Sequence, residues 1–425
     1  MKRFASLIAA AALACLPGAA LADTMVIHAG SVIRDADSGP SGPATITVTD
    51  GRIVSIEDGM RPAPDGAQSV DLSGKTVMPG LIDLHTHISG DPSGDYWRAA
   101  IDPPEWYAML AAKNARLTAK AGFTTVRDLG SRTAQVTQAL RRATAEGMMP
   151  GPRIVTSGRT IAIVGGHGDT SGFLPEVNDV IASGFACTGA VECAQKVRQA
   201  SKYGADLIKI TATGGVLSQQ GRGLEAHFSD AEMKSIVDTA NLLGLKVAAH
   251  AHGARGIEAA ARAGVHTIEH GTYIDEAAAR AMKANGTILV PTLMAYEGIK
   301  EKVGTGFYTP VVDAKIREAG QYADTIVTRA IRWGVPVAFG TDAGVYPHGD
   351  NAGEFALLVA QGMSNRDAVR AATTYAAQVI GMEDEIGRLA PGFSADLIAL
   401  DGNPLENAAL LEDVDWVMVR GRVVE

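Results

Sequence analysis

Eight short apolar runs, separated by amphipathic segments, constrain the fold of this 425-residue chain more than any other feature. Strand-like runs that alternate with helix-like stretches are typical of repeated βα units around a parallel sheet. The runs are 81–87, 124–129, 153–157, 207–211, 247–250, 266–270, 288–291 and 335–341. Helix-like stretches lie at 104–121, 191–203, 229–243, 254–263, 275–284 and 314–333. This order predicts an α/β fold, a closed (β/α)8 TIM barrel.

Both ends of the chain follow a different pattern. Residues 24–78, and the stretch from Ala395 onward, alternate apolar and polar side chains between turn residues. Such alternation indicates half-exposed antiparallel strands. Because neither end is long enough to bury a core alone, we expect the two to pair in one small β-sandwich domain. The predicted division is 23–79 plus 388–425 for this domain, and 80–387 for the barrel.

The first 22 residues have the pattern of a secretory signal peptide. Lys2 and Arg3 precede an apolar stretch, and Ala-Leu-Ala at residues 20–22 forms a small-residue cleavage site. A lipoprotein cysteine at Cys15 is the alternative, although Ala12 is a poor match to the start of that motif. No later stretch approaches the roughly 18–20 consecutive apolar residues of a membrane span. We therefore expect a secreted, periplasmic protein without a membrane span.

Charge and cysteine content narrow the function classes further. The formal net charge is −9 and no basic cluster is present, so nucleic acid is not an expected partner. Cys187 and Cys193 lie six residues apart, and an oxidising compartment favours a local disulfide between them. Two free thiols are the alternative. Neither cysteine has a second Cys or His pair at zinc-finger spacing, so we do not expect either to bind a metal.

Polar residues end several of the predicted strands. In a (β/α)8 barrel, the C-terminal strand ends and the loops after them form the active face. His85 and His87 end the first run, and alternate residues share one side of a strand, so both imidazoles can reach one cation. His250 and His270 end two further runs, and Asp342 follows the eighth. Several nitrogen ligands favour a transition metal such as zinc.

Lys209 is the unusual member of this set. Its ammonium group would be repelled by cations, unless carbon dioxide adds to Nζ and converts the side chain to an anion. Such an N6-carboxylysine can bridge two divalent cations about 3.5 Å apart. An ion pair between Lys209 and Asp342 is the alternative. Asp342 is placed to bind one metal, to accept the proton of the attacking water and to return it to the leaving nitrogen.

These residues lie in segments that resemble the amidohydrolase superfamily. The segments are Pro79-Gly-Leu-Ile-Asp-Leu-His-Thr-His, Lys209, His250, His270 with Glu269 before it, Gly340-Thr-Asp, and Gly387-Arg-Leu-Ala-Pro-Gly-Phe-Ser-Ala-Asp-Leu. The chain is most similar to the branch with imidazolonepropionase-like enzymes, metal-dependent prolidases and Xaa-Arg/Lys carboxypeptidases. The resemblance covers essentially the whole mature chain. It implies two divalent metal ions, one held by His85, His87, Lys209 and Asp342 and the other by Lys209, His250 and His270.

Substrate-binding candidates follow from neighbouring segments. Gly165-Gly-His-Gly-Asp-Thr resembles the loop after strand three in the dipeptidase branch, which makes His167 the candidate that polarises the scissile carbonyl. His252 shares a side of its strand with His250, so it is a candidate for contacting substrate. The glycine-rich segment after Lys209 is expected to be a substrate loop. In it, Arg222 is placed to bind a terminal carboxylate and His227 to assist.

The leading hypothesis is an exported binuclear metal-dependent amide hydrolase. It would release the C-terminal amino acid from dipeptides or short peptides, with Arg or Lys favoured by resemblance. A basic side chain would need an acidic partner, and the candidates are Asp91, Asp95, Asp102 and Glu225. One alternative is an amidase for N-acyl or aromatic amino-acid conjugates, such as the phenylalanine amide of ochratoxin, or for hydrophobic C-terminal residues. An Xaa-Pro dipeptidase is another.

A non-catalytic periplasmic binding protein is the hypothesis from a different class. The presence of all six predicted metal residues argues against it. Apolar stripes on the outer helices allow a homo-oligomer but do not predict one, because the helices of every such barrel carry them.

Overall fold

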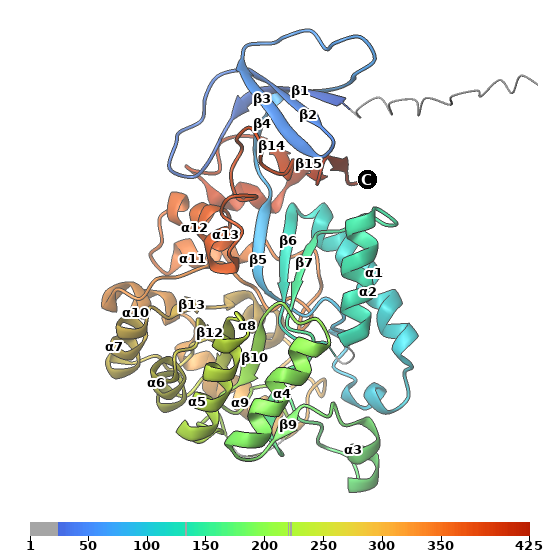
Figure 1. Ribbon diagram of the computed structural model, residues 1–425. Helices are drawn as coiled ribbons and strands as arrows, with labels where there is room; N and C mark the ends of the chain where they lie inside the picture. The colour runs from blue at the N-terminus through green and yellow to red at the C-terminus, as the bar shows by residue number, and fades with distance from the viewer. Residues whose placement is uncertain (1–23, 132–133, 220, 222) are drawn as a thin grey trace, which may run out of the picture.

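The computed structural model describes residues 24–131, 134–219, 221 and 223–425. The predicted signal peptide and Arg222 lie outside these residues. Two regions are visible in Figure 1, a β-rich region that contains the first and last strands, β1 and β16, and a larger α/β body. Among the described residues, no helix is both long and apolar enough to cross a membrane.

Seven strands and one extended segment form a TIM-barrel-like body, as predicted. The strands are β5 (Leu81–Thr86), β6 (Phe123–Asp128), β7 (Arg153–Thr156), β10 (Ile208–Thr211), β11 (Val247–Ala251), β12 (Thr267–His270) and β13 (Ile288–Val290). Neighbours pair in parallel within two sheets, β5-β6-β7 and β10-β11-β12-β13. Ile161 bridges to Ile210 between the two sheets.

The predicted eighth strand, 335–341, is the exception. It is not a regular strand, so that part of the prediction is wrong in detail. Its backbone nevertheless closes the barrel, because Val337 pairs in parallel with Leu289 and the Leu84 N–H donates to the Phe339 carbonyl at 3.1 Å. The segment therefore lies between β13 and β5, where the sequence pattern placed it.

Helices cover the outside of the barrel, and further helices lie in the segments that connect its strands (Figure 1). Those between barrel strands are α1 (Pro104–Lys120), α2 (Ala134–Glu146), α4 (Ala190–Lys202), α5 (Asp230–Leu242), α6 (Ala254–Ala263) and α7 (Glu276–Asn285). After β13 come α8 (Leu293–Lys300), α9 (Pro310–Ala323), α10 (Ile326–Trp333), α11 (Gly353–Ala360), α12 (Asn365–Ala371) and α13 (Thr374–Ile380). Shorter elements are η1 (Tyr96–Ala100), β8 (Ala162–Ile163), α3 (Pro175–Ile181), β9 (Ala186–Cys187) and η2 (Ala408–Glu412).

The predicted helix at 314–333 is wrong, because two helices, α9 and α10, occupy this stretch. Thr325 leaves the helical region, with φ −132° and ψ 7°, and begins α10 as its N-cap. The apolar period continues across the break, which is why the sequence pattern did not reveal it. Asp324-Thr325 is the local signal, since both residue types favour helix ends over helix interiors.

Both chain ends meet in one seven-stranded sheet, in the order β16-β15-β14-β4-β1-β2-β3. Its strands are β1 (Thr24–Val32), β2 (Ala44–Thr49), β3 (Arg52–Asp58), β4 (Gln68–Pro79), β14 (Leu397–Leu400), β15 (Val414–Val419) and β16 (Arg422–Val423). The expected pairing of the two ends is thus confirmed. The expectation of purely antiparallel pairing is wrong for β1 and β4, which are parallel because the β2–β3 hairpin separates them along the chain.

Cys187 and Cys193 form a disulfide between β9 and the first turn of α4, as expected. At the other end of the barrel, only Gly80 separates β4 from β5. The predicted domain division at residues 79 and 80 remains a prediction.

Gly340 allows the eighth segment to approach β5 and β13. A Cβ there would lie 2.4 Å from Val290 Cγ1 and 3.1 Å from His85 Cβ. We predict that Gly340→Ala lowers the free energy of unfolding by about 1–3 kcal/mol, because packed interiors do not absorb an added methyl group. Thermal melts would measure the loss.

Gly42→Ala is the matched control for that variant, since a Cβ at Gly42 would meet nothing within 4 Å. Its melting temperature should equal or slightly exceed that of the wild type. Equal melting temperatures for Gly340→Ala and wild type would show that the eighth segment packs less closely against β5 and β13 than described.

Candidate active site

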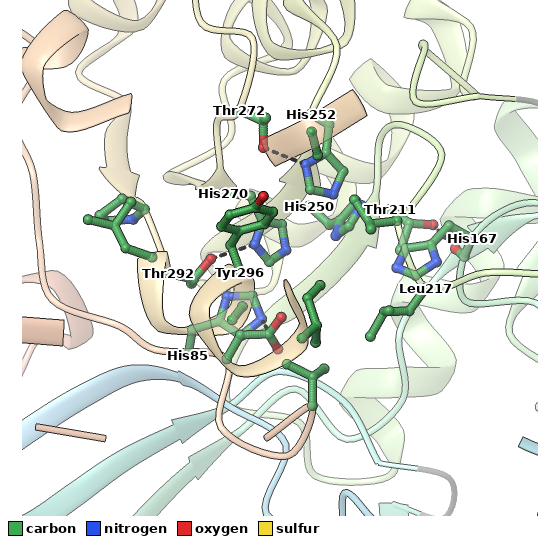
Figure 2. A pocket seen from close by; sticks show the side chains of 18 of the residues that line it. His85, His167, Thr211, Leu217, His250, His252, His270, Thr272, Thr292 and Tyr296 are labelled. Carbon is green, nitrogen blue, oxygen red and sulfur yellow. Dashed lines mark hydrogen bonds and ion pairs between the residues drawn. The ribbon is translucent and has the colours of Figure 1, made fainter. Parts of the chain in front are cut away.

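A cavity of about 290 Å³ opens at the C-terminal ends of the barrel strands. All six predicted metal residues line it: His85, His87, Lys209, His250, His270 and Asp342. Figure 2 shows the histidine side chains converging on one space from several elements. The structure thus brings together residues that are as much as 257 positions apart between His85 and Asp342 in the chain. The expected convergence of strand ends is the reason.

His85, His87 and Asp342 form the first group. Their candidate ligand atoms all lie within 4.8 Å of one another. Asp342 Oδ1 lies 3.4 Å from His85 Nε2 and 3.2 Å from His87 Nε2, yet no described residue gives this buried oxygen a well-formed hydrogen bond. His87 Nδ1 donates to the Gly130 carbonyl at 2.8 Å, which turns Nε2 toward Asp342. A buried carboxylate oxygen without a well-formed hydrogen bond is a suitable ligand for a cation.

His85 is oriented from behind by a buried ion pair. Its Nδ1 donates to Glu269 Oε2 at 2.9 Å, and Arg127 donates to Glu269 Oε1 at 2.8 Å. Burial alone raises the pKa of Glu269, but Arg127 and His85 outweigh it and hold that pKa at about 2. Burial, together with Lys209, lowers the pKa of His85 to about 4. His85 is therefore neutral with Nε2 facing the cavity, the tautomer that a metal requires.

His250, His252 and His270 form the second group, again with ligand atoms within 4.8 Å of one another. Burial lowers the pKa of His252 to about 3 and those of His250 and His270 well below their usual value. Three neutral imidazole rings this close together can all donate nitrogen lone pairs to one cation. Without a cation, these buried nitrogen atoms would have to satisfy one another. His252 was predicted to contact substrate, and its position makes it an additional candidate ligand.

Threonine hydroxyls orient two of these rings, as Figure 2 shows. His252 Nδ1 shares a hydrogen bond of 2.7 Å with Thr272 Oγ1, and His270 Nδ1 shares one of 2.6 Å with Thr292 Oγ1. Sequence reasoning missed both threonines. The position of Thr272, two residues after His270, is the only local signal.

Lys209 Nζ lies 3.3 Å from His85 Nε2. Burial lowers the pKa of Lys209 to about 8, in spite of the nearby carboxylates Glu269 and Asp342. An amine with a lowered pKa is more often neutral near physiological pH, and the neutral form is the one that reacts with carbon dioxide. The surroundings of Lys209 are therefore compatible with carboxylation.

His167 also lines the cavity, with its ring centroid 4.3 Å from that of His250. Gly215 leaves room for it, since a Cβ there would come within 2.3 Å of the His167 ring. Burial lowers the pKa of His167 to about 3, so the ring is neutral and presents one N–H. His227 instead lies beside Gly166 and Gly214 and is not among the described lining residues.

One wall of the cavity is apolar, and sequence reasoning missed it. The wall side chains come from α8, α9, α10 and the segment after β10: Val216, Leu217, Leu293, Tyr296, Ile299, Ala319, Ala323 and Ile326. Among the described lining residues, Asp342 is the only carboxylate. The four acids considered as partners for a basic substrate side chain, Asp91, Asp95, Asp102 and Glu225, do not line this cavity. The wall thus suits an apolar group.

Glu354 of α11 fixes the start of α8 and hence this wall. Thr292 is the N-cap of α8 but does not cap it through its side chain, because its hydroxyl is bound to His270. Glu354 supplies the missing acceptors, taking the Leu293 N–H at 3.0 Å and the Met294 N–H at 2.7 Å. Unsatisfied N–H groups at a buried helix end are costly, so Glu354 holds both the wall and Thr292 in place.

We predict that Glu354→Leu destabilises the fold by at least about 1–3 kcal/mol, because two buried N–H groups lose their acceptor. Catalytic efficiency should fall with it, through displacement of Thr292 and His270. Glu354→Gln keeps one acceptor and should recover part of both losses. Glu105→Gln, on the exposed side of α1, is the control. Thermal melts and turnover would measure these effects, and wild-type values for Glu354→Leu would exclude the role.

The same carboxyl group predicts a pH dependence. Burial raises the pKa of Glu354 from 4.5 to about 8. A carboxyl group with a raised pKa in the folded state binds its proton more tightly there, so its stabilising contribution is lost as the pH rises through that value. Between pH 6.5 and pH 9, the wild-type melting temperature should fall further than that of Glu354→Gln. Parallel curves for the two proteins would contradict the shift.

Comparison with known proteins gives consistent matches. The model of the amidohydrolase family matches residues 76–424. The ochratoxinase of Aspergillus niger is 32% identical over 356 residues, which cover 79% of this chain and 72% of the relative. A solved Xaa-Pro dipeptidase with bound methionine in its active site is 38% identical, with a TM-score of 0.85, covering 94% of this chain and 99% of that one. A prolidase complexed with N-methylphosphonate-L-proline is 33% identical, with a TM-score of 0.84 and the same coverage.

Proposed function

Because the chain belongs to the amidohydrolase family and is a metal-dependent hydrolase of amide or peptide bonds, we propose that it releases an apolar C-terminal amino acid from its substrates. The substrates are dipeptides or N-acyl amino acids. The single observation that carries this proposal is the apolar wall of α8, α9 and α10, which faces the two groups of candidate metal ligands across one cavity.

Two divalent cations would be held by the strand-end residues. We assign His85, His87, Lys209 and Asp342 to one, and Lys209, His250 and His270 to the other, with His252 as an additional candidate. The buried Asp342 oxygen and the neutral imidazoles support this assignment. Zinc, and an N6-carboxylysine at Lys209 as the shared ligand, are parts of the proposal. Bound cations would supply Lewis acidity, which lowers the pKa of water and polarises a carbonyl oxygen.

Asp342 is the proposed general base and general acid of the reaction. Burial alone raises the pKa of its carboxyl group, but the imidazoles of His85 and His87 outweigh it and hold that pKa well below its usual range. The carboxylate is therefore ionised and accepts the proton of the attacking water. It then passes this proton to the nitrogen of the leaving amino acid. One side chain thus serves both halves of the reaction.

His167 orients the scissile carbonyl. Its neutral ring stands beside His250 and donates one N–H to the carbonyl oxygen as negative charge develops there. Arg222 and His227 stay candidates for binding the terminal carboxylate of the substrate. The convergence of all six predicted metal residues on this cavity argues against a binding protein without catalysis.

The apolar wall favours a hydrophobic released residue over Arg or Lys. A basic side chain in this cavity would lose its hydration without gaining a carboxylate partner, apart from the proposed metal ligand Asp342. The related Xaa-Pro dipeptidase with methionine in its active site agrees with an apolar residue. Proline release and Arg or Lys release remain the alternatives. We also propose that the protein is exported after residues 1–22 are removed. The proposed domains are residues 23–79 plus 388–425 for the β-rich domain and residues 80–387 for the barrel.

The metal assignment predicts that chelation abolishes amide hydrolysis and that zinc restores it. Lys209→Ala should lose most bound metal and most activity, because both cations lose a shared anionic ligand. Short carboxylic acids are expected to restore a part. Lys120→Ala, at the exposed end of α1, is the control. Elemental analysis would decide, since less than about one metal per two wild-type chains after zinc supplementation is incompatible with a metal enzyme of this kind.

The wall predicts the substrate preference. Among dipeptides with a common N-terminal residue, we expect kcat/KM for Phe, Leu and Met at the C-terminal position to exceed that for Arg and Lys at least about tenfold, because an unpaired buried charge costs more than 1.4 kcal/mol. Ala319→Glu should narrow or invert this ratio. Ala314→Glu, on the exposed side of α9, should not. Wild-type preference for Arg or Lys would restore the basic carboxypeptidase hypothesis.

A further inference from the structure

A second cavity, of about 330 Å³, lies next to the first. His87, Leu217 and Val345 line both, so the two meet at the first group of candidate ligands. A carbonyl carbon placed at these ligands has one substituent on each side. If the released amino acid occupies the apolar cavity, the acyl half of the substrate must extend into the second one. We call the second cavity the acyl cavity.

We propose that the acyl cavity binds the N-terminal residue of the substrate and selects for its free α-ammonium group, which makes the enzyme a dipeptidase and disfavours N-acyl amino acids. The inference rests on the proposed function and deepens it, since the apolar wall alone does not distinguish these two substrate classes. Its basis is the shape and the charge of the acyl cavity.

The wall of the acyl cavity is a fixed part of the fold. The loop after β5 forms much of it, and Asn114 of α1 donates to two carbonyls of this loop, Ile88 at 2.9 Å and Gly90 at 3.0 Å. Gly90 packs so closely against Gly344 that a Cβ would lie 2.7 Å from the Gly344 Cα. Gly94 of the same loop packs against the ring of Phe307. The acyl cavity is thus formed before any substrate arrives.

The charge of the acyl cavity is negative. Asp91 and Asp95 supply carboxylates to its lining, and Arg98 supplies the one guanidinium among the described lining residues. Arg98 is already paired, donating to Asp102 at 2.8 Å, and its guanidinium lies 5.5 Å from the centre of the Trp106 ring. Asp102, which does not line the acyl cavity, thus takes the direct hydrogen bond of Arg98. Asp91 and Asp95 interact with the Arg98 charge only at longer range, and they form no ion pair with another described residue within 4.0 Å.

The contrast between the two cavities sets the orientation of the substrate. An ammonium group gains an attractive interaction beside Asp91 and Asp95, and loses hydration against the apolar wall. A dipeptide with an apolar C-terminal residue therefore fits across the metal ligands in one direction. A neutral acyl group gains nothing from the carboxylates, and an acyl group with its own carboxylate is repelled.

Two substrates test this charge selection. Alanyl-phenylalanine and propionyl-phenylalanine release the same amino acid and differ only in the α-ammonium group. For the zinc-loaded wild type, kcat/KM for alanyl-phenylalanine should exceed that for propionyl-phenylalanine by about tenfold or more, as two nearby carboxylates at the protein surface allow. In the double variant Asp91→Asn, Asp95→Asn, the ratio should fall to about one.

Asp65→Asn is the matched control, because Asp65 is an exposed carboxylate in the loop between β3 and β4 of the terminal sheet. Its ratio should equal that of the wild type. A wild-type ratio near or below one, or an unchanged ratio in the double variant, overturns the selection while leaving phenylalanine release intact. Release of phenylalanine from neither substrate overturns the proposed function and this inference together.

Discussion

The buried carboxylate of Glu269 is the constraint on which the site depends. It joins His85 of β5 to Arg127 of β6, and it belongs to β12, so three barrel strands are fixed by one side chain. Arg127 extends the connection by donating to the Leu84 carbonyl and to Thr267. Removing one partner of such a pair would leave an uncompensated buried charge, a cost of about 3–5 kcal/mol in other proteins. The candidate ligand His85 is therefore held by the same interaction that holds the barrel.

Backbone conformation at the site shows how firmly the fold determines it. His270, Thr292 and Asp342 all adopt positive φ, at 74°, 52° and 61°. Residues with a Cβ rarely adopt this conformation, which costs on the order of 1–3 kcal/mol each. All three lie at the C-terminal ends of barrel strands or of the eighth segment, where the chain turns sharply into a loop. Packing of the surrounding strands offsets the cost and points the side chains into the cavity.

The sequence predicted most of this arrangement, because the C-terminal ends of barrel strands and the loops after them form the active face. Seven of the predicted runs are strands. His85, His250 and His270 lie at or next to the C-terminal ends of their strands, and Lys209 is the second residue of β10. The break at Thr325 had only the weak local signal of Asp324-Thr325 against a continuing apolar period, and the parallel pairing of β1 with β4 depends on tertiary packing. The apolar wall was missed for a similar reason. Leu293, Ile299 and Ile326 follow the same period as any core-facing helical residue, and only the folded chain shows that they face a cavity.

Glu354 connects substrate preference with the position of a candidate metal ligand. The helix that it caps carries part of the apolar wall, and the N-cap of that helix, Thr292, is hydrogen-bonded to His270. An attempt to redesign substrate preference by repacking α8 would therefore also disturb the candidate metal ligand His270. Laboratory evolution toward new amide substrates should find easier routes through α9 and α10. There, side chains reach the cavity without a hydrogen bond to a candidate ligand, so selectivity can change while metal affinity is preserved.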